Sequence, residues 1–249
     1  MNFKKAVVTG GSKGIGAAAA IALAREGADV LLVARDENGL KSVQSQIIKI
    51  GRRCEYIKMD IGNPAEVERF ENSLHDFGGV DLYINNAAFT IRKSIIKTSY
   101  EEMFSLYQTN FFGAILMTQA AARCMKAQNR GGAITFVTSI NALSPLPNQG
   151  IYSCTKASLE AAVKSLAAEL APYNIRVNSV APGAVLTDMN PGLIGERADN
   201  LAKTIPLGHI GTPEEIADVI VFLCSAQAQY ITGSTIVAGG GFLLRKIGG

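Results

Sequence analysis

A tyrosine and a lysine four residues apart are the side chains in this sequence best suited to moving a proton. Tyr152 and Lys156 open a run of strong helix formers at 157–170, and residues four apart lie on the same face of a helix. A free phenol loses its proton near pH ~10, but a neighbouring cation favours the phenolate and brings its pKa closer to neutrality. The pair is therefore a candidate acid/base device, although a half-buried tyrosine above a solvated lysine gives the same spacing.

A glycine-rich stretch near the N-terminus is the second group with chemical potential. Gly10, Gly14 and Gly16 follow an apolar run at Lys5–Thr9 and open a helical pattern. Glycines at such a place permit a tight turn and a close approach of the backbone to a pyrophosphate, and the amides of a helix N-terminus attract the anion. The stretch predicts a dinucleotide site; the alternative is a glycine-rich turn with no ligand.

The end of the second predicted strand indicates which dinucleotide is bound. An acidic residue there would bind the adenosine ribose of NAD, but Ala34 takes that place and Arg35 follows it. Arg35 can form paired hydrogen bonds with a 2′-phosphate, and Ser12 and Lys13 can reach the same group. We therefore expect NADP(H), unless Asp36 turns inward or Arg35 is only a solvated charge.

The elements that position these groups alternate along the whole chain. Apolar runs predict strands at 5–9, 30–34, 55–59, 82–85, 133–138, 176–180 and 235–237, and amphipathic patterns predict helices at 15–26, 37–50, 64–77, 100–127, 153–170 and 213–225. Repeated βα units of this kind predict an α/β fold. We expect a single domain over residues 1–249, built as a Rossmann-type doubly wound sheet of about seven parallel strands with helices on both faces. Residues 184–206 lack periodicity and are too long for an ordinary connection, so we interpret them as a substrate lid.

Composition excludes several classes of protein. The chain has 249 residues, of which 48% are hydrophobic and 18% charged, so a disordered chain is excluded. A net charge of +3, with scattered basic residues, argues against a nucleic-acid partner. No apolar run reaches the ~20 residues of a membrane span, and the N-terminus enters a strand rather than a signal peptide. The four cysteines are far apart, so we expect buried reduced thiols, no metal site and a cytoplasmic protein.

Several motifs, in their order and spacing, resemble those of the short-chain dehydrogenase/reductase family. They are Thr9 with the glycines at 10, 14 and 16, then Asn85-Asn86-Ala87, Asn110, Ser139, Tyr152 with Lys156, and Pro182-Gly183. The similarity runs from Lys5 to about Gly241 and is closest to the branch that includes ketoacyl, steroid, sugar and tropinone reductases. Two positions depart from the family pattern: Ala88 and Ala238 stand where glycine and aspartate are usual.

The resemblance implies a role for each matching residue. Tyr152 would protonate the substrate carbonyl or act as the base for the alcohol, Lys156 would favour the phenolate and hold the nicotinamide ribose, and Ser139 would hydrogen-bond the carbonyl oxygen. Asn110 would hold a water that relays protons. The cofactor would contact Gly10, Ser12, Lys13, Gly14, Ile15, Gly16, Arg35, Asp60, Ile61, Asn86, Ala87, Tyr152, Lys156, Pro182, Gly183, Val185 and Thr187.

The implied function is NADPH-dependent interconversion of a ketone and a secondary alcohol. One alternative is 3-oxoacyl-(acyl-carrier-protein) reduction, for which Arg130 is suitably placed but Tyr173 stands where a second basic residue is expected. Another is a non-catalytic NADP-binding regulatory protein. A serine nucleophile at Ser139 lacks a base partner, because His75 and His209 give no hint of a triad.

Assembly and substrate are the least determined by the sequence. The family resemblance implies a homotetramer, with a homodimer as the alternative, built on the helices at 100–127 and 153–170 and on the C-terminal strand. We expect a small carbonyl or alcohol substrate in a mainly apolar pocket, so alicyclic or aromatic ketones are plausible. Its lining is expected to include Phe89, Leu143, Leu146, Met189 and Leu193. The physiological substrate and the preferred direction of the reaction are left open.

Overall fold

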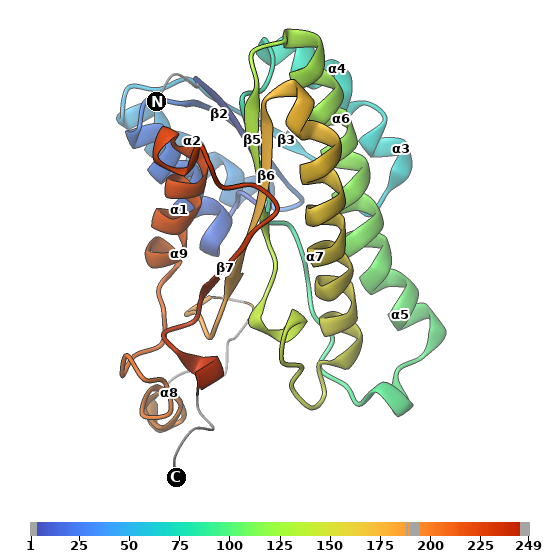
Figure 1. The fold of residues 1–249 in the computed structure, drawn as a ribbon, viewed down its shortest axis with the longest axis vertical. Helices are drawn as coiled ribbons and strands as arrows, with labels where there is room; N and C mark the ends of the chain where they lie inside the picture. The colour runs from blue at the N-terminus through green and yellow to red at the C-terminus, as the bar shows by residue number, and fades with distance from the viewer. Residues whose placement is uncertain (1–3, 188, 190–194, 245–249) are drawn as a thin grey trace.

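A seven-stranded, all-parallel sheet forms the centre of the computed structural model, which describes residues 4–187, 189 and 195–244 (Figure 1). Its strand order is β3-β2-β1-β4-β5-β6-β7, so the order reverses between β1 and β4. Ligands bind at such a reversal in open α/β sheets, outside the carboxyl ends of the strands. The strands are β1 (Lys5–Thr9), β2 (Asp29–Ala34), β3 (Cys54–Lys58), β4 (Leu82–Asn85), β5 (Gly132–Val137), β6 (Ile175–Pro182) and β7 (Thr235–Ala238).

Helices cover both faces of the sheet, as the βα pattern predicted. On one face lie α1 (Gly14–Arg25), α2 (Glu37–Lys49) and α9 (Pro213–Cys224), and on the other lie α3 (Pro64–Val67), α4 (Phe70–Phe77), α5 (Tyr100–Tyr107), α6 (Ala114–Gln128) and α7 (Gly150–Leu170) (Figure 1). Each face buries its own apolar cluster, in which Leu23 and Ile220 represent the first face and Phe70 and Val163 the second. Strands covered on both faces explain the near-continuous apolar runs.

Side-chain caps fix the beginnings of several helices. Asp36 caps α2 by accepting the Gly39 amide at 3.2 Å. Ser99 and Thr212 start α5 and α9, and each forms a capping box with the glutamate three residues later. Such caps satisfy backbone donors that a helix start leaves open. The predicted helix starts at Tyr100 and Pro213 are therefore confirmed.

The predicted helix at 100–127 is not continuous. A π-helical turn, η2 (Gln108–Gly113), separates α5 from α6. A Cβ atom on Gly113 would lie 2.1 Å from the carbonyl oxygen of Ile61, so the backbone here passes too close to the neighbouring loop for any side chain. The sequence pattern could not predict this turn, because its cause is a contact between distant segments. Similarly, the predicted helix at 64–77 is divided into α3 and α4.

The segment predicted to be a lid contains a short helix of its own. Helix α8 spans Gly195–Ala202 and lies apart from the other helices, beyond the carboxyl edge of the sheet (Figure 1). Residues 188 and 190–194 of this segment lie outside the described residues. An isolated β-bridge joins Val185, at the start of this segment, to Gly211, which lies shortly after its end.

Candidate active site

A cavity of about 630 Å³ opens at the carboxyl edge of the sheet, where the strand order reverses. It is bordered by the β1–α1 loop, the ends of β2, β4, β5 and β6, and the start of α7. Nearly all the predicted site residues line it; Gly16 and Asn110 do not. Both are buried. Gly16 packs against Gly10 and Asn110 hydrogen-bonds Phe89, and these two partners line the cavity.

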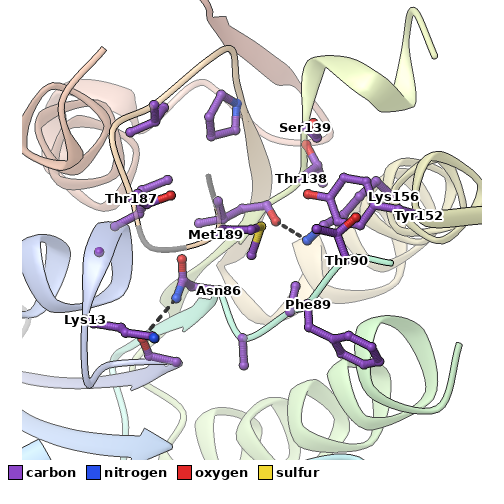
Figure 2. A pocket seen from close by; sticks show the side chains of 18 of the residues that line it. Lys13, Asn86, Phe89, Thr90, Thr138, Ser139, Tyr152, Lys156, Thr187 and Met189 are labelled. Carbon is purple, nitrogen blue, oxygen red and sulfur yellow. Dashed lines mark hydrogen bonds between the residues drawn. The ribbon is translucent and has the colours of Figure 1, made fainter. Parts of the chain in front are cut away.

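The proton-transfer pair lies on one wall of this cavity (Figure 2). Helix α7 begins at Gly150, two residues before Tyr152, so both Tyr152 and Lys156 are helical. Their side chains are 7% and 3% exposed. The Lys156 ammonium donates to the carbonyl oxygen of Val137 at 2.9 Å and lies 5.8 Å from the centroid of the tyrosine ring. The predicted side-by-side arrangement is therefore present.

Burial sets the ionisation of the pair. It raises the pKa of Tyr152 to about 12, against a smaller lowering by a hydrogen bond with Ser139. It also lowers the pKa of Lys156 to about 8, against an opposite effect of the Glu160 carboxylate. The expectation that the ammonium brings the phenol closer to neutral pH is not met in the protein without ligand, because loss of water around the phenol dominates. Tyr152 is thus a proton donor at neutral pH.

Ser139 completes the group that can act on a carbonyl oxygen. It is the second residue after the end of β5, is 9% exposed, and its Oγ accepts the Asn141 amide at 3.1 Å. Neither His75 nor His209 lines the cavity. His209 instead hydrogen-bonds Glu215 at 2.9 Å on the surface. A nucleophilic role for Ser139 therefore lacks a histidine base.

Asn110 lies in the π-helical turn and connects three segments. Its Oδ1 accepts the Phe89 amide at 3.0 Å, while its Nδ2 donates to the Phe89 carbonyl at 2.9 Å and to the Thr155 hydroxyl at 3.3 Å. These contacts fix the segment after β4 against α7. Both amide donors are used within the chain, so the predicted water relay would have to use the remaining acceptor capacity of Asn110.

The glycine-rich loop is shaped as a dinucleotide cradle requires. Gly10 has a φ of +65°, and a Cβ on Gly16 would lie 2.2 Å from the Gly10 carbonyl oxygen. Helix α1 starts after Lys13 without a side-chain cap, in contrast to α2, α5 and α9. Its first amides can therefore bind an anion. Close packing, left-handed backbone and uncapped amides together fit the pyrophosphate of a nicotinamide dinucleotide.

Thr9 and Asn86 hold this loop to the end of β4. The Thr9 hydroxyl accepts the amides of Asn86 and Ala87 at 2.9 and 3.1 Å. The Asn86 Nδ2 donates to the carbonyl oxygens of Thr9 and Gly10 at 3.0 and 3.3 Å. Asn86 was predicted to line the adenosine ribose. It does line the cavity, and its amide donors also secure the loop.

The charges at the far end of the cavity bear on cofactor choice. Arg35 is exposed and lies 3.6 Å from the Asp60 carboxylate. Asp36 caps α2 with its carboxylate and also lines this end of the cavity, so an acidic residue stands beside the basic ones there. Arg35, Ser12 and Lys13 all line this end. The predicted cationic group is therefore assembled around one part of the cavity.

The other end of the cavity is more polar than the sequence suggested. Phe89, Leu146 and Met189 line it as expected, whereas Leu143 is half-exposed and outside the lining; Leu193 lies outside the described residues. Thr90, Asn141 and Gln149 also line it, and Thr90 Oγ1 and Asn141 Oδ1 have no hydrogen-bond partner among the described residues. No motif in the sequence singles out these polar groups.

The two departures from the family pattern cause no backbone strain. Ala88 lines the cavity, and its φ is not positive. Ala238 ends β7, where its carbonyl oxygen accepts the Gly183 amide at 2.9 Å. The backbone at position 88 therefore does not need the left-handed conformation that favours glycine.

Other chemistry predicted to be absent can be checked within the described residues. No group of three or more histidine, cysteine, aspartate or glutamate side chains there could hold a metal ion. All four cysteines are free; Cys54, Cys124 and Cys224 are buried, whereas Cys154 is exposed, contrary to its expected packing role. Among the helices that the structure describes, none is both long and apolar enough to cross a bilayer.

Comparisons with known proteins agree with the geometry. The sequence model of the family described as enoyl-(acyl carrier protein) reductase matches residues 10–243. L-rhamnose 1-dehydrogenase (NAD(P)(+)) from Azotobacter vinelandii is 38% identical over 248 residues, which cover 97% of each chain. 3-Oxoacyl-(acyl-carrier-protein) reductase from Aquifex aeolicus is 38% identical over 240 residues, covering 96% of each.

Solved structures give the same result. An acetoin dehydrogenase from Salmonella typhimurium superposes with a TM-score of 0.91 at 33% identity, covering 98% of this chain and 97% of that one. An L-sorbose reductase from Gluconobacter frateurii, complexed with NADPH and L-sorbose, gives 0.90 at 34% identity, with 96% of each chain covered. With the glycine-rich cradle and the buried tyrosine–lysine pair at one sheet edge, this chain belongs to the short-chain dehydrogenase/reductase family of nicotinamide-dependent oxidoreductases that act on CH–OH or carbonyl groups.

Proposed function

We propose that this protein is an NADPH-dependent oxidoreductase that interconverts a ketone and a secondary alcohol, with Tyr152 as the acid/base. The observation that carries the proposal is the buried Tyr152, hydrogen-bonded with Ser139 and one helical turn from the buried Lys156, on the wall of a cavity with a dinucleotide cradle. Such a cofactor supplies the hydride when it is bound. The protein must then position the carbonyl and deliver one proton.

The chain's own residues divide this work. Tyr152 donates its proton to the carbonyl oxygen as the carbon is reduced, and its high pKa keeps that proton in place until then. Ser139 donates a hydrogen bond to the same oxygen, so two hydroxyls stabilise the developing alkoxide. Lys156 provides positive charge beneath the phenolate that remains. Asn110 fixes the wall that carries these groups.

The cofactor set is proposed from the lining of the cavity. Gly10, Gly14, Ile15 and Gly16 would hold the pyrophosphate, and Arg35 with Ser12 and Lys13 would bind a 2′-phosphate. Asp60 and Ile61 would contact the adenine, while Asn86 and Ala87 would line its ribose. Pro182, Gly183, Val185 and Thr187 would enclose the nicotinamide end, with Tyr152 and Lys156 at its ribose.

The experiment is a turnover assay with a panel of ketones, each supplied with NADPH or NADH. The panel contains an alicyclic ketone, an aromatic ketone, a hydroxyketone and a keto sugar, because the relatives act on several of these classes. We expect NADPH oxidation with at least one of them and a loss of roughly a thousandfold in kcat for Tyr152→Phe. Tyr100→Phe is the control, since Tyr100 is exposed on α5. Normal turnover by Tyr152→Phe would remove this residue from the mechanism.

A second candidate is reduction of a 3-oxoacyl group on an acyl carrier protein, because one of the relatives has this activity. An acidic carrier would need basic residues beside the cavity. Arg130 was the expected contact, but its Nη2 is bound to Asp81 at 2.7 Å. A comparison of a carrier-bound substrate with the same acyl group on a small thioester tests this alternative; a strong preference for the carrier-bound form would favour it.

A non-catalytic regulatory role would need only the cofactor cradle. Asn110, Ser139, Tyr152 and Lys156 are nevertheless all present and buried on or behind one wall. We therefore favour the enzyme. Binding of NADPH with no turnover of any carbonyl in the panel would support the regulatory alternative.

Assembly, the lid and the compartment are proposed together. Apolar and aromatic side chains remain exposed along α5, η2 and α6, including Tyr100, Phe104, Phe112 and Leu116, and we propose that a homotetramer covers them. We further propose that residues 184–206 close over the substrate within a single domain, and that the enzyme acts in the cytoplasm. A monomeric mass by light scattering at micromolar concentration would contradict the assembly.

A further inference from the structure

A buried glutamate lies one helical turn beyond the catalytic pair. Glu160 is 8% exposed and follows Lys156 by four residues on α7, so Tyr152, Lys156 and Glu160 occupy one face of the helix. Burying a carboxylate is costly unless hydrogen bonds and opposite charge compensate it. The sequence pattern did not single out this residue, and the proposed proton transfer does not use it.

Three hydroxyl groups surround the Glu160 carboxylate. One oxygen accepts from Thr138, which directly follows β5, and the other accepts from Thr235 on β7. The Ser179 hydroxyl on β6 also lies 2.9 Å from that second oxygen. An ionised carboxylate only accepts hydrogen bonds, so a shell of hydroxyl donors suits it. Glu160 thereby fastens α7 to β6, to β7 and to the segment that follows β5.

Hydroxyl groups leave the charge of Glu160 unbalanced. Within the described part of the chain, no lysine, arginine or histidine forms a salt bridge with it. The charge that Glu160 acts on is Lys156, whose pKa it raises against the stronger lowering by burial. The Lys156 ammonium itself donates to a neutral group, the Val137 carbonyl. Lys156 and Glu160 are thus two buried ionisable side chains one helical turn apart, and neither forms a salt bridge with another described residue.

Among the described residues, the other groups that the hydrogen bonds place around Lys156 and Glu160 carry no fixed charge. From α7 the facing titratable groups are Tyr152 and Glu160. β5 and the segment that follows it present the Val137 carbonyl and the hydroxyls of Thr138 and Ser139, and β6 presents Ser179. From η2 comes the neutral Asn110, joined to Thr155. Removal of the Glu160 charge would leave the ammonium without compensation.

We propose that Glu160 is a positioning residue that acts through Lys156: it is the counter-ion that keeps the buried ammonium charged while its hydroxyl contacts hold α7 over the sheet. This inference rests on the proposed role of Lys156 in the reaction. A charged Lys156 is what stabilises the phenolate left on Tyr152 after proton donation. Glu160 would thus set the upper pH limit of activity without touching substrate.

The direct test follows the ionisation of Lys156 by NMR, with lysine labelled by carbon-13 at the ε position. The Lys156 signal is identified by its absence from Lys156→Met. In the wild type we expect its midpoint near pH 8, well below those of surface lysines. Glu160→Gln keeps the size and can still accept and donate hydrogen bonds, so we expect the Lys156 midpoint to fall by about one pH unit or more.

Two matched variants separate charge from structure. Ser179→Ala removes one hydroxyl contact and keeps the charge, so the Lys156 midpoint should remain close to the wild-type value. Glu160→Asp keeps the charge but draws it away from Lys156 on a shorter side chain, so the Lys156 midpoint should fall below the wild-type value, by less than in Glu160→Gln. If Glu160→Gln does not fold, the Asp variant decides: a Lys156 midpoint at the pH of surface lysines, or no change after the carboxylate has moved away, would overturn the proposal.

Activity provides the second readout. For Glu160→Gln, the alkaline limb of the pH profile of kcat/KM should move to lower pH by the same amount as the Lys156 midpoint, while the KM for NADPH at the low-pH plateau stays within a few-fold. A Lys156 midpoint unchanged in Glu160→Gln overturns this inference even if turnover is normal. Absence of carbonyl turnover by the wild type overturns the proposed function instead, and leaves the NMR result standing.

Discussion

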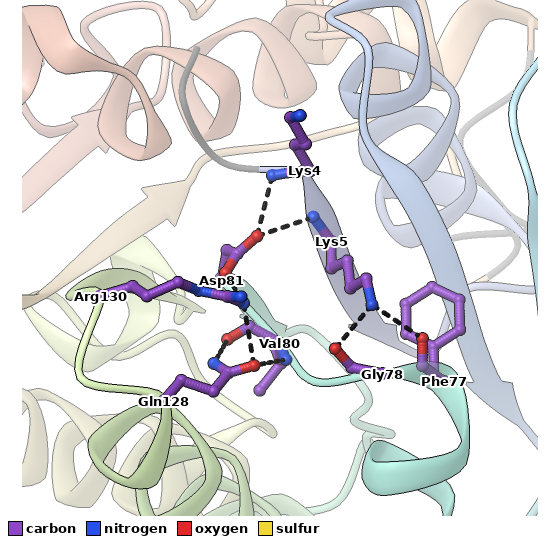
Figure 3. A network of polar contacts seen from close by, with 8 residues as sticks. All are labelled: Lys4, Lys5, Phe77, Gly78, Val80, Asp81, Gln128 and Arg130. Carbon is purple, nitrogen blue, oxygen red and sulfur yellow. Dashed lines mark hydrogen bonds and ion pairs between the residues drawn. The ribbon is translucent and has the colours of Figure 1, made fainter.

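The parallel strands begin at one edge of the sheet, the amino edge, and end at the other, the carboxyl edge. These two edges bury charged groups in opposite ways. At the amino edge, Asp81 is 5% exposed; one carboxylate oxygen accepts the amides of Lys4 and Lys5 at 2.8 and 3.1 Å, and the other accepts the Arg130 guanidinium at 2.7 Å (Figure 3). Gln128 adds paired hydrogen bonds to the backbone of Val80. Both carboxylate oxygens of the buried Asp81 are satisfied by the chain itself, which is how buried charges support a fold.

The carboxyl edge leaves bonding capacity for a ligand. Lys156 donates to one carbonyl oxygen, α1 begins without a side-chain cap, and two buried oxygens, on Thr90 and Asn141, have no partner in the part of the chain that the structure describes. These groups converge on the cavity rather than on one another. The polar groups at the amino edge therefore bond to one another, whereas those at the carboxyl edge keep bonding capacity for a ligand. We expect changes at the first to alter stability and changes at the second to alter binding and catalysis.

The largest contrast is expected between two glycines at opposite ends of α1. In Gly16→Ala the new Cβ would lie 2.2 Å from the Gly10 carbonyl oxygen, whereas a Cβ at Gly27 would meet nothing within 4 Å. We expect Gly16→Ala to weaken NADPH binding by roughly a hundredfold, the scale of an overpacked site. Gly27→Ala should lower stability through its φ of +93° and leave NADPH affinity intact. Fluorescence titration with NADPH and thermal melts measure both; equal affinities would break the comparison.

A substitution in the amino-edge network should lower stability and leave catalysis intact. Asp81→Asn removes the charge that binds Arg130 and replaces an acceptor of two backbone amides, so we expect a loss of about 2 kcal/mol in the free energy of unfolding. Urea denaturation measures this loss, with kcat/KM per folded molecule as the control. A fall in kcat/KM with unchanged stability would show that the two edges are not separate in function.

How much the sequence could predict also differs between regions. The apolar runs predicted all seven strands, because strands buried on both faces carry their signal in every residue. Most cavity-lining residues were likewise found, since glycine and the tyrosine–lysine pair have local motifs. The break in the helix at Gly113 and the shell around Glu160 depend on contacts between distant segments. No local pattern encodes such contacts.

A smaller effect is expected for Arg35, which lies at the cavity end but is exposed. Its guanidinium is 3.6 Å from Asp60, so the Arg35 side chain can turn between this carboxylate and a phosphate group. We expect Arg35→Ala to reduce the ratio of kcat/KM for NADPH to that for NADH by roughly tenfold, the value of one charged hydrogen bond. Steady-state kinetics with both cofactors measures the ratio. Equal or better use of NADH by the wild type would defeat the NADP assignment.

The smallest effect is expected for Arg130, which either supports the amino edge through Asp81 or contacts an acyl carrier protein. Its side chain is about half exposed, and its partner Asp81 is buried, so solvent weakens the pair and Arg130→Ala should cost about 1 kcal/mol of stability. If the residue only supports the amino edge, carrier-bound and free ketone substrates should be turned over at wild-type rates. A selective rise in KM for a carrier-bound substrate would instead make Arg130 a docking residue. Stability and substrate kinetics of Arg130→Ala therefore decide whether this residue only stabilises the amino-edge network or also binds an acyl carrier protein.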